Sequence, residues 1–345
     1  MVPRLDLPWD MAELEVMARS HLTHEAAVYF ETTATYPPSR ENERAWRGWR
    51  FQPRVGIDVR HVTTETEMLG TTMTAPILLA PCAFAGYAHT EGEWAVARAA
   101  AERELVYIVS SASSKPPETV PGQARATCWA QLYVPADRQE AAGVVRRAEE
   151  AGFEAIVVTV DAPVGSLRHV GFVPYPSDEE PFSFGRPGGT LLNAGITWQT
   201  IEDIAGLTSL PVLVKGVLHA EDACRALERG ARGIVVSNHG GRQLDGVVPT
   251  ALVIEEIAAA VADRMVVLVD GGIRSGRDVL RALCLGAHGA LVGRPYLWAL
   301  AAAGEGGVDL LMQRMCLELE NALALTGCRT VADARRDLLR WHEAY

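Results

Sequence analysis

The feature that most constrains the fold is a regular alternation of short apolar runs with alanine-rich helical segments, which begins at residue 76. Short apolar runs bounded by turn residues are typical of buried parallel strands when helices separate them. The strand-length runs are Ile77–Ala80, Leu105–Val109, Cys128–Leu132, Ala155–Val160, Val212–Val214, Ile234–Val236, Val266–Val269 and Ala290–Val292. The helical segments are Glu91–Arg103, Arg138–Ala151, Glu221–Gly230, Ala251–Ala262, Ser275–Leu285 and Pro295–Ala302. Eight strands alternating with helices predict an α/β fold whose sheet closes into a (β/α)8 or TIM barrel.

Residues 1–75 lack this alternation and are predicted to form an N-terminal helical extension that packs on the barrel of residues 76–345. Met11–Leu22 and Glu41–Trp49 have helical spacing, and consecutive prolines interrupt the chain between them. Arg50–Val59 is predicted to be extended. Leu310–Leu325 predicts a further helix that follows the barrel.

Composition excludes several classes of protein. The formal net charge of −11 over 345 residues argues against a nucleic-acid partner, because phosphate backbones need a basic face. The six cysteines are scattered without a Cys-x-x-Cys pair, which predicts reduced thiols and neither a disulfide framework nor a metal site. No signal segment or membrane-spanning run is found, so we expect a cytoplasmic protein that is not bound to a membrane.

Polar residues follow almost every predicted strand. In a barrel of parallel strands these positions meet at one face, where barrel enzymes keep their chemistry. Strands must end in some residue, so one or two polar side chains there would mean little. The set at this face is Pro81, Cys82, Ala83, Ser110, Gln131, Tyr133, Thr159, Asp161, Lys215, Ser237, His239, Asp270, Gly272, Gly293 and Arg294.

The segment Ser237–Asp245 follows the sixth strand and carries a histidine, a glycine pair and an arginine. His239 suits proton abstraction, because the pKa of free histidine is close to neutrality. Arg242 offers a planar fork that binds a carboxylate or a phosphate through two hydrogen bonds. The alternative is a hydrogen-bonded histidine in a polar turn beside a surface arginine. The combination favours an enzyme that acts on a small anionic substrate.

Two glycine turns occupy the places where barrels commonly hold a phosphate. Asp270-Gly-Gly272 follows the seventh strand, and Gly293-Arg294 follows the eighth. Glycines allow backbone N–H groups to approach a phosphate, and the helix predicted from Pro295 adds the positive end of its dipole. Lys215 fits either a Schiff-base nucleophile or a fixed cation beside a cofactor, and its sequence position leaves both roles open.

These segments resemble one family. Leu213-Val-Lys-Gly216, Ser237-Asn-His-Gly-Gly-Arg242, Val269-Asp-Gly-Gly-Ile-Arg274 and Leu291-Val-Gly-Arg294 look like motifs of the FMN-dependent α-hydroxy acid oxidases and dehydrogenases. Glycolate, lactate and mandelate oxidases belong to this family. Further matches are Ala80-Pro-Cys-Ala83, His89-Thr-Glu-Gly-Glu93, Gln131-Leu-Tyr133 and Thr159-Val-Asp161. The resemblance runs from about Arg50 to Cys328.

The resemblance implies a role for each matching residue. His239 would take a proton from the substrate, Asp161 would steady the resulting imidazolium, and Tyr133 would hydrogen-bond the substrate oxygen. Arg242 and Arg168 would hold the substrate carboxylate. The residues implied around FMN are Lys215 beside the flavin N1–C2 edge, with Pro81, Cys82, Ala83, Ser110, Gln131, Thr159, Ser237, Asp270, Gly271, Gly272, Arg274, Gly293 and Arg294.

Departures from the family pattern concern the substrate. Tyr29 and Tyr36 compete for the place of the family's N-terminal tyrosine. Ala112 stands where glycolate oxidase has tryptophan, and Gly165 stands where it has leucine; both changes enlarge the pocket. We therefore expect a 2-hydroxy acid larger than glycolate or lactate, such as a mandelate or a natural-product intermediate.

Ala83 occupies a position where oxidases of the family tend to carry alanine, which favours O2 as the electron acceptor. Dehydrogenase and oxidative decarboxylase reactions remain alternatives. The resemblance also implies a homo-oligomer, which we expect to be a homotetramer. A Schiff-base aldolase that uses Lys215, a flavin-dependent isopentenyl diphosphate isomerase and a binding protein without catalysis are the competing classes. The last two explain the Ser237–Arg242 block and the polar strand ends less well.

Overall fold

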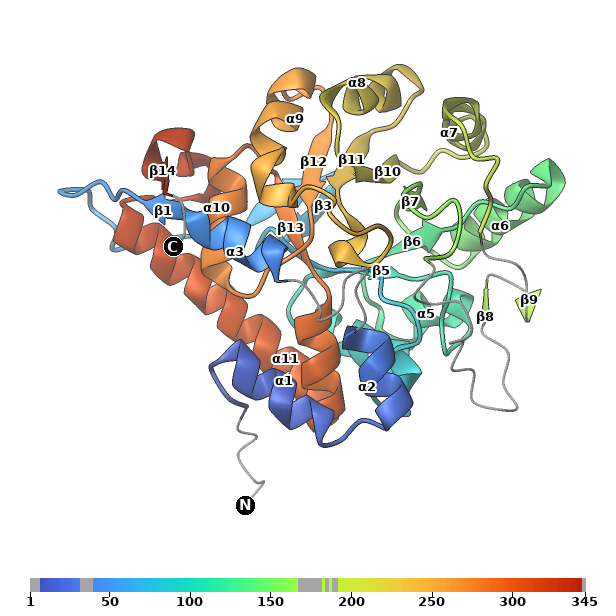
Figure 1. Cartoon of the computed structure of the whole chain (residues 1–345), viewed down its shortest axis with the longest axis horizontal. Helices are drawn as coiled ribbons and strands as arrows, with labels where there is room; N and C mark the ends of the chain where they lie inside the picture. The colour runs from blue at the N-terminus through green and yellow to red at the C-terminus, as the bar shows by residue number, and fades with distance from the viewer. Residues whose placement is uncertain (1–6, 32–39, 167–181, 184–185, 188–191, 343–345) are drawn as a thin grey trace.

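A computed structural model describes residues 7–31, 40–166, 182–183, 186–187 and 192–342. Eight parallel strands close into one barrel, in which each strand pairs with its neighbours along the chain and β13 pairs back with β4 (Figure 1). The predicted (β/α)8 fold is confirmed. The barrel strands are β4 Ile77–Leu79, β5 Val106–Val109, β6 Cys128–Leu132, β7 Ile156–Thr159, β10 Val212–Val217, β11 Gly233–Val236, β12 Val266–Val269 and β13 Gly289–Val292.

Alternating side chains divide the core into two layers. Leu78, Ile108 and Trp129 belong to a cluster inside the barrel. The residues on either side of Leu78, which are Ile77 and Leu79, pack outwards against the helices. Successive residues of a strand face opposite sides of the sheet, and the strands are buried on both sides. This explains why they read as continuous apolar runs in the sequence.

Helices surround the barrel and cover one end of it (Figure 1). Long α11 packs against α1, α4 and α10. Arg314 on α11 donates to the carbonyl oxygen of Pro8 at 2.9 Å, which fixes the entry to α1. The helices are α1 Met11–Arg19, α2 His24–Glu31, α3 Glu41–Gly48, α4 Gly92–Glu102, α5 Val120–Ala124, α6 Arg138–Glu150, α7 Trp198–Ala205, α8 Ala220–Glu228, α9 Ile254–Val261, α10 Gly276–Cys284 and α11 Arg294–Thr326.

Short strand pairs lie outside the barrel, and the sequence patterns did not predict the pairing of their strands. The hairpin of β2 (Thr66–Met68) and β3 (Thr71–Met73) places Met68 and Met73 in the interior cluster. The extension is therefore not purely helical. Of the segment predicted to be extended, β1 (Trp49–Phe51) is a strand, and it pairs with β14 (Leu339–Trp341). A further pair, β8 (Phe182–Ser183) and β9 (Arg186–Pro187), lies between β7 and β10.

Three details differ from the predicted elements. Helix α7 was missed, because only two of its residues, Ile201 and Ile204, are buried. Strand β10 extends beyond Val214, so Lys215 lies within the strand and not after its end. The helices predicted separately after β13 form one element, which is interrupted where Ala303 and Gly304 leave helical geometry.

All six cysteines are free, in agreement with the prediction of reduced thiols. Among the described residues, no helix is long and apolar enough to cross a membrane. The division of the chain at residue 75 stays a prediction.

Candidate active site

A cavity of about 490 Å³ opens at the carboxyl ends of the barrel strands. It gathers residues from seven of the strand ends and from α2. Most of the site residues predicted from the sequence face it, and Tyr29 is among them. The predicted residues that line the cavity are Tyr29, Pro81, Cys82, Ala83, Ser110, Tyr133, Lys215, His239, Arg242, Asp270, Gly271, Gly272, Arg274, Gly293 and Arg294. Arg168 and Tyr36 lie outside the described residues.

His239 and Asp161 form a hydrogen-bonded pair, with 2.9 Å between Nδ1 and Oδ1. Burial alone would raise the pKa of Asp161, but His239 and Lys215 hold this pKa below its ordinary value. An ionised carboxylate only accepts hydrogen bonds, so Nδ1 carries the proton of a neutral His239. Nε2 then keeps a lone pair, and the ring lines the cavity. This arrangement suits a general base.

Backbone conformation brings the pair together. Gly216 has a φ of +113°, and a Cβ atom at this position would lie 2.5 Å from Cβ of Asp161. Only glycine therefore allows β10 to pass so close to the carboxylate. His239 itself has a φ of +55°, in the left-handed region that few side chains adopt. The N–H of His239 donates to Oγ of Ser237 at 3.1 Å, which stabilises this turn.

Lys215 is buried, and its ammonium group contacts two side chains. Its Nζ lies 2.9 Å from Oγ of Ser237 and 3.2 Å from Oδ2 of Asp270. Burial alone would lower the pKa of this ammonium group, but the carboxylates of Asp270 and Asp161 outweigh burial and raise it. A Schiff-base nucleophile needs a lowered pKa and a free amine. Lys215 is therefore a fixed cation in this cavity.

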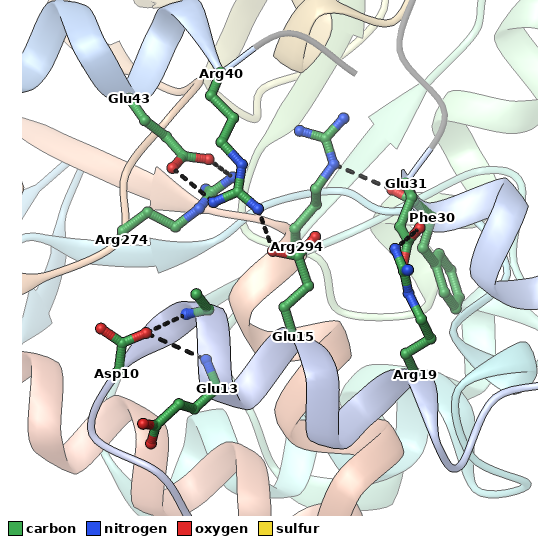
Figure 2. Close-up of polar contacts among 11 residues, drawn as sticks. Asp10, Glu13, Glu15, Arg19, Phe30, Glu31, Arg40, Glu43, Arg274 and Arg294 are labelled. Atoms are coloured by element: carbon green, nitrogen blue, oxygen red, sulfur yellow. Dashed lines mark hydrogen bonds and ion pairs between the residues drawn. The ribbon is translucent and has the colours of Figure 1, made fainter. Parts of the chain in front are cut away.

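Arg242 and Arg294 approach the same end of α2. Arg242 donates to the carbonyl oxygen of Tyr29 at 2.9 Å, and its guanidinium carbon lies 5.0 Å from the centre of the Tyr29 ring. Nε of Arg294 donates to the carbonyl oxygen of Phe30 at 3.1 Å (Figure 2). The carbonyl groups of a helix C-terminus carry partial negative charge, which favours guanidinium groups there. The end of α2 thus orients two arginines of the cavity.

The cavity fits the phosphate group of a cofactor. Burial, together with the positive charges of Arg242 and Arg274, lowers the pKa of Arg294. Among the described residues no carboxylate pairs with Arg294, so a bound anion would relieve this repulsion. Arg294 also begins α11, whose N-terminal N–H groups and dipole favour an anion.

A second observation fits the sugar-alcohol chain of FMN. Oδ1 of Asp270 is buried and has no hydrogen-bond partner among the described residues. A buried acceptor without a donor is costly, and hydroxyl groups of a ribityl chain are such donors. The residues present therefore fit FMN at both its phosphate and its ribityl groups.

Besides Asp161, three predicted residues lie behind the cavity wall and not in it. Gln131 donates to Oγ1 of Thr159 at 2.9 Å and accepts from the N–H of Ser111 at 3.1 Å. Ser237 lies under Lys215, as described above. Gln131 and Thr159 link the buried ends of β5, β6 and β7, whereas Ser237 joins the end of β11 to Lys215 of β10. The structure thus gives them fixed positions, while their contact with a flavin stays a prediction.

The remaining wall contains small, aliphatic and aromatic residues. Ala112 and Gly165 both line the cavity, as expected from the sequence. Tyr29 packs edge-on against Phe84 and Tyr87, and its ring centre lies 5.7 Å and 6.1 Å from theirs. This part of the wall offers apolar contacts and open space.

Sequence reasoning missed residues that support the site from outside. Asn42 of α3 exchanges two hydrogen bonds with Asn238, each of 2.9 Å. Glu93 is fully buried and accepts from the N–H groups of Ala85 and Ser114, both at 3.0 Å. Glu93 is the last residue of the segment His89-Thr-Glu-Gly-Glu93, which resembles the family, but the resemblance did not indicate a role for it. Nothing in the local sequence links Asn42 to its partner, which is 196 residues away.

The fold and the cavity define a (β/α)8 barrel enzyme with a place for a flavin phosphate. The chain matches the family of FMN-dependent dehydrogenases over residues 18–341, and it belongs to this family. Its cofactor is accordingly FMN. Enzymes of this class oxidise 2-hydroxy acids, which agrees with a base and an arginine at one cavity.

Similar proteins include several hydroxy acid oxidases. The 4-hydroxymandelate oxidase of Amycolatopsis orientalis is 44% identical over 302 residues, which cover 82% of this chain and 84% of that protein. The peroxisomal (S)-2-hydroxyacid oxidase GLO4 of Arabidopsis thaliana is 42% identical over 316 residues, 87% of each chain. A crystal structure of mandelate oxidase has a TM-score of 0.90 at 41% identity, and covers 97% of this chain and 98% of the other.

Proposed function

We propose that this FMN-dependent enzyme oxidises an (S)-2-hydroxy acid with an aromatic side chain, such as mandelate or 4-hydroxymandelate, to the 2-oxo acid. One observation carries the proposal. His239 and Arg242 face a cavity whose wall has only small side chains at Ala112 and Gly165. The likeness to the 4-hydroxymandelate oxidase of Amycolatopsis orientalis supports the same substrate class.

In this proposal each residue of the site has a separate role. Arg242, with Arg168, binds the substrate carboxylate, and Tyr133 hydrogen-bonds the hydroxyl oxygen. Nε2 of His239 accepts a substrate proton, and the carboxylate of Asp161 stabilises the imidazolium that forms. Lys215 supplies a fixed positive charge. When bound, FMN would supply the acceptor for the two electrons and the second proton that the substrate loses as its hydroxyl-bearing carbon becomes a carbonyl.

The test compares substrates under anaerobic conditions. We expect (S)-mandelate to bleach the flavin absorbance with a second-order rate constant about 30- to 150-fold above that of glycolate, because burial of a phenyl group contributes about 2–3 kcal/mol. Ala112→Trp and Gly165→Leu should each lower this rate constant for mandelate more than for glycolate. Equal turnover of glycolate in the wild type would overturn the aromatic assignment.

For the acceptor we propose O2, with H2O2 as the product, and the support is Ala83 in the cavity wall. Readmission of air to the bleached enzyme should restore the flavin absorbance within seconds and release one H2O2 per 2-oxo acid. Slow reoxidation would favour the dehydrogenase alternative. Release of CO2 with a shortened carboxylic acid would favour the oxidative decarboxylase.

We also propose a homotetramer in the cytoplasm. Exposed apolar residues on α11, Leu317 and Leu325, support association, and the six free cysteines support a reducing compartment. Light scattering coupled to size exclusion tests the assembly, and a monomeric mass at micromolar concentration would contradict it. Fractionation of the producing cells tests the compartment.

A further inference from the structure

The first turn of α3 contacts two loops of the cavity at once. Oδ1 and Nδ2 of Asn42 exchange hydrogen bonds with the side chain of Asn238, the residue that precedes His239. Oδ1 of Asn42 also accepts from the N–H of Thr250 at 3.4 Å. Asn238 in turn donates to the carbonyl oxygen of Val248 at 3.3 Å. The amide of Asn42 therefore ties the loop that carries the base to α3.

The same turn lies directly against the glycine turn after β12. A Cβ atom at Gly272, where φ is +80°, would lie 2.6 Å from the backbone carbonyl carbon of Asn42. A Cβ atom at Gly271 would lie 3.1 Å from Nδ2 of Asn42 and 3.2 Å from Oδ1 of Asn238. The two glycines thus permit a close approach that any other residue would prevent. Asn42 therefore contacts both this turn and the loop that carries His239.

Two further contacts hold α3 in this place. Nε1 of the fully buried Trp46 donates to the carbonyl oxygen of Gly271 at 2.7 Å. Glu43 accepts from Arg274 at 2.9 Å, and both side chains of this ion pair are largely buried (Figure 2). With its peptide oxygen engaged by Trp46, Gly271 has a fixed peptide plane. Asn42, Glu43 and Trp46 together hold α3 against the glycine turn.

We propose that Asn42 is a positioning residue that sets the glycine turn for the FMN phosphate and the backbone of His239 for proton transfer. The inference rests on the assignments of His239 as the base and of Gly271–Gly272 as part of the phosphate site. It goes beyond them because Asn42 touches neither the cavity nor any reacting atom. One side chain thereby connects cofactor affinity with catalysis.

The experiment measures FMN affinity and chemistry separately in Asn42→Ala. Apoprotein is titrated with FMN, and quenching of flavin fluorescence gives the Kd. We expect the Kd to rise about ten-fold, which corresponds to about 1.4 kcal/mol. At saturating FMN, the rate of anaerobic bleaching by (S)-mandelate should also fall at least ten-fold. Arg44→Ala, an exposed change on the same helix, serves as the control and should alter neither value.

Asn42→Asp separates positioning from a loss of folding. Aspartate has almost the same shape and keeps the acceptor for Asn238 and Thr250, but it turns an oxygen in place of the donor towards Oδ1 of Asn238, so both effects should persist in a protein that folds. Effects of Asn42→Ala and Asn238→Ala should not add in the double variant, because the two substitutions remove the same pair of hydrogen bonds. Unchanged Kd and rate in Asn42→Ala would overturn the inference, and so would a change in only one of them. Failure of the wild type to bind FMN or to react with mandelate would instead contradict the proposed function.

Discussion

At the scale of single residues, the function depends on the charged groups of Asp161 and Lys215 near the imidazole ring of His239. Asp161 accepts the Nδ1 proton of His239, and Lys215 places a permanent charge nearby. The lowered pKa of Asp161 favours the ionised carboxylate. The histidine is therefore held in one tautomer with Nε2 free for the substrate.

Asp161→Asn tests this orientation. An asparagine can present its N–H2 group to Nδ1, which would favour the tautomer with the proton on Nε2 and remove the base. We expect kcat to fall by about 10²- to 10⁴-fold, the usual contribution of a positioned base. Stopped-flow bleaching with (S)-mandelate measures the loss. Binding of the 2-oxo acid product, seen as a shift of the flavin spectrum, should persist, and its disappearance would indicate a collapsed site.

The raised pKa of Lys215 gives a prediction about pH. A group whose folded pKa is raised keeps its full charge below its ordinary value, about 10.4 for lysine, and loses it only at higher pH. We expect kcat/KM to show no alkaline decline from Lys215 up to about pH 10. A pH profile of the wild type measures this. A decline centred near pH 8 that vanishes in Lys215→Arg would contradict the prediction.

At the scale of elements, close packing of helices sets where the phosphate end of the cavity lies. A Cβ atom at Gly276 would lie 2.3 Å from both the N atom of Leu319 and the carbonyl oxygen of Met315 on α11. Helices α10 and α11 therefore cross with their backbones nearly in contact. Since α10 follows the glycine turn and α11 begins at Arg294, this crossing positions both parts of the predicted phosphate site.

Gly276→Ala should destabilise the fold, because the backbones must move apart to admit one methyl group. We expect the free energy of unfolding to fall by about 1–3 kcal/mol, the typical effect of overpacking. Urea denaturation followed by circular dichroism measures it. Gly122→Ala is the matched control, because a Cβ atom there meets nothing within 4 Å, and it should be neutral or slightly stabilising.

At the scale of the whole molecule, cofactor binding and folding are linked. Burial and the nearby charges of Arg242 and Arg274 disfavour the charged form of Arg294, as its lowered pKa indicates, and a bound anion would offset both effects. A ligand that binds only the folded state stabilises it, by about 2.7 kcal/mol at 100 times its Kd. FMN should thus act as a structural component as well as a reactant.

Thermal unfolding of the apoprotein tests this linkage. We expect FMN to raise Tm by several degrees, and inorganic phosphate to raise it by a smaller amount. Riboflavin, which lacks the phosphate group, serves as the comparison and should stabilise less than FMN at equal concentration. Equal stabilisation by riboflavin and FMN would show that Arg242, Arg274 and Arg294 do not bind the phosphate group.

The sequence by itself determined the barrel and most of the predicted cavity. Each strand and helix of the repeating unit is encoded locally by apolar runs and helical spacing, and closure of eight such units then brings all carboxyl ends of the strands together. For this reason the sequence alone assigns His239, Asp161, Lys215 and the glycine turns to one face of the barrel. Helix α7 and the β2–β3 hairpin were missed because such short elements carry little periodic signal.

Only the tertiary structure decided how these residues are held. It placed Lys215 inside β10, Tyr29 in the cavity wall, and Gln131, Thr159 and Ser237 behind this wall. It also brought Asn42 to Asn238. The physical reason is that hydrogen bonds and ion pairs depend on distances of a few ångströms between side chains far apart in the chain, and a periodic pattern does not specify such distances.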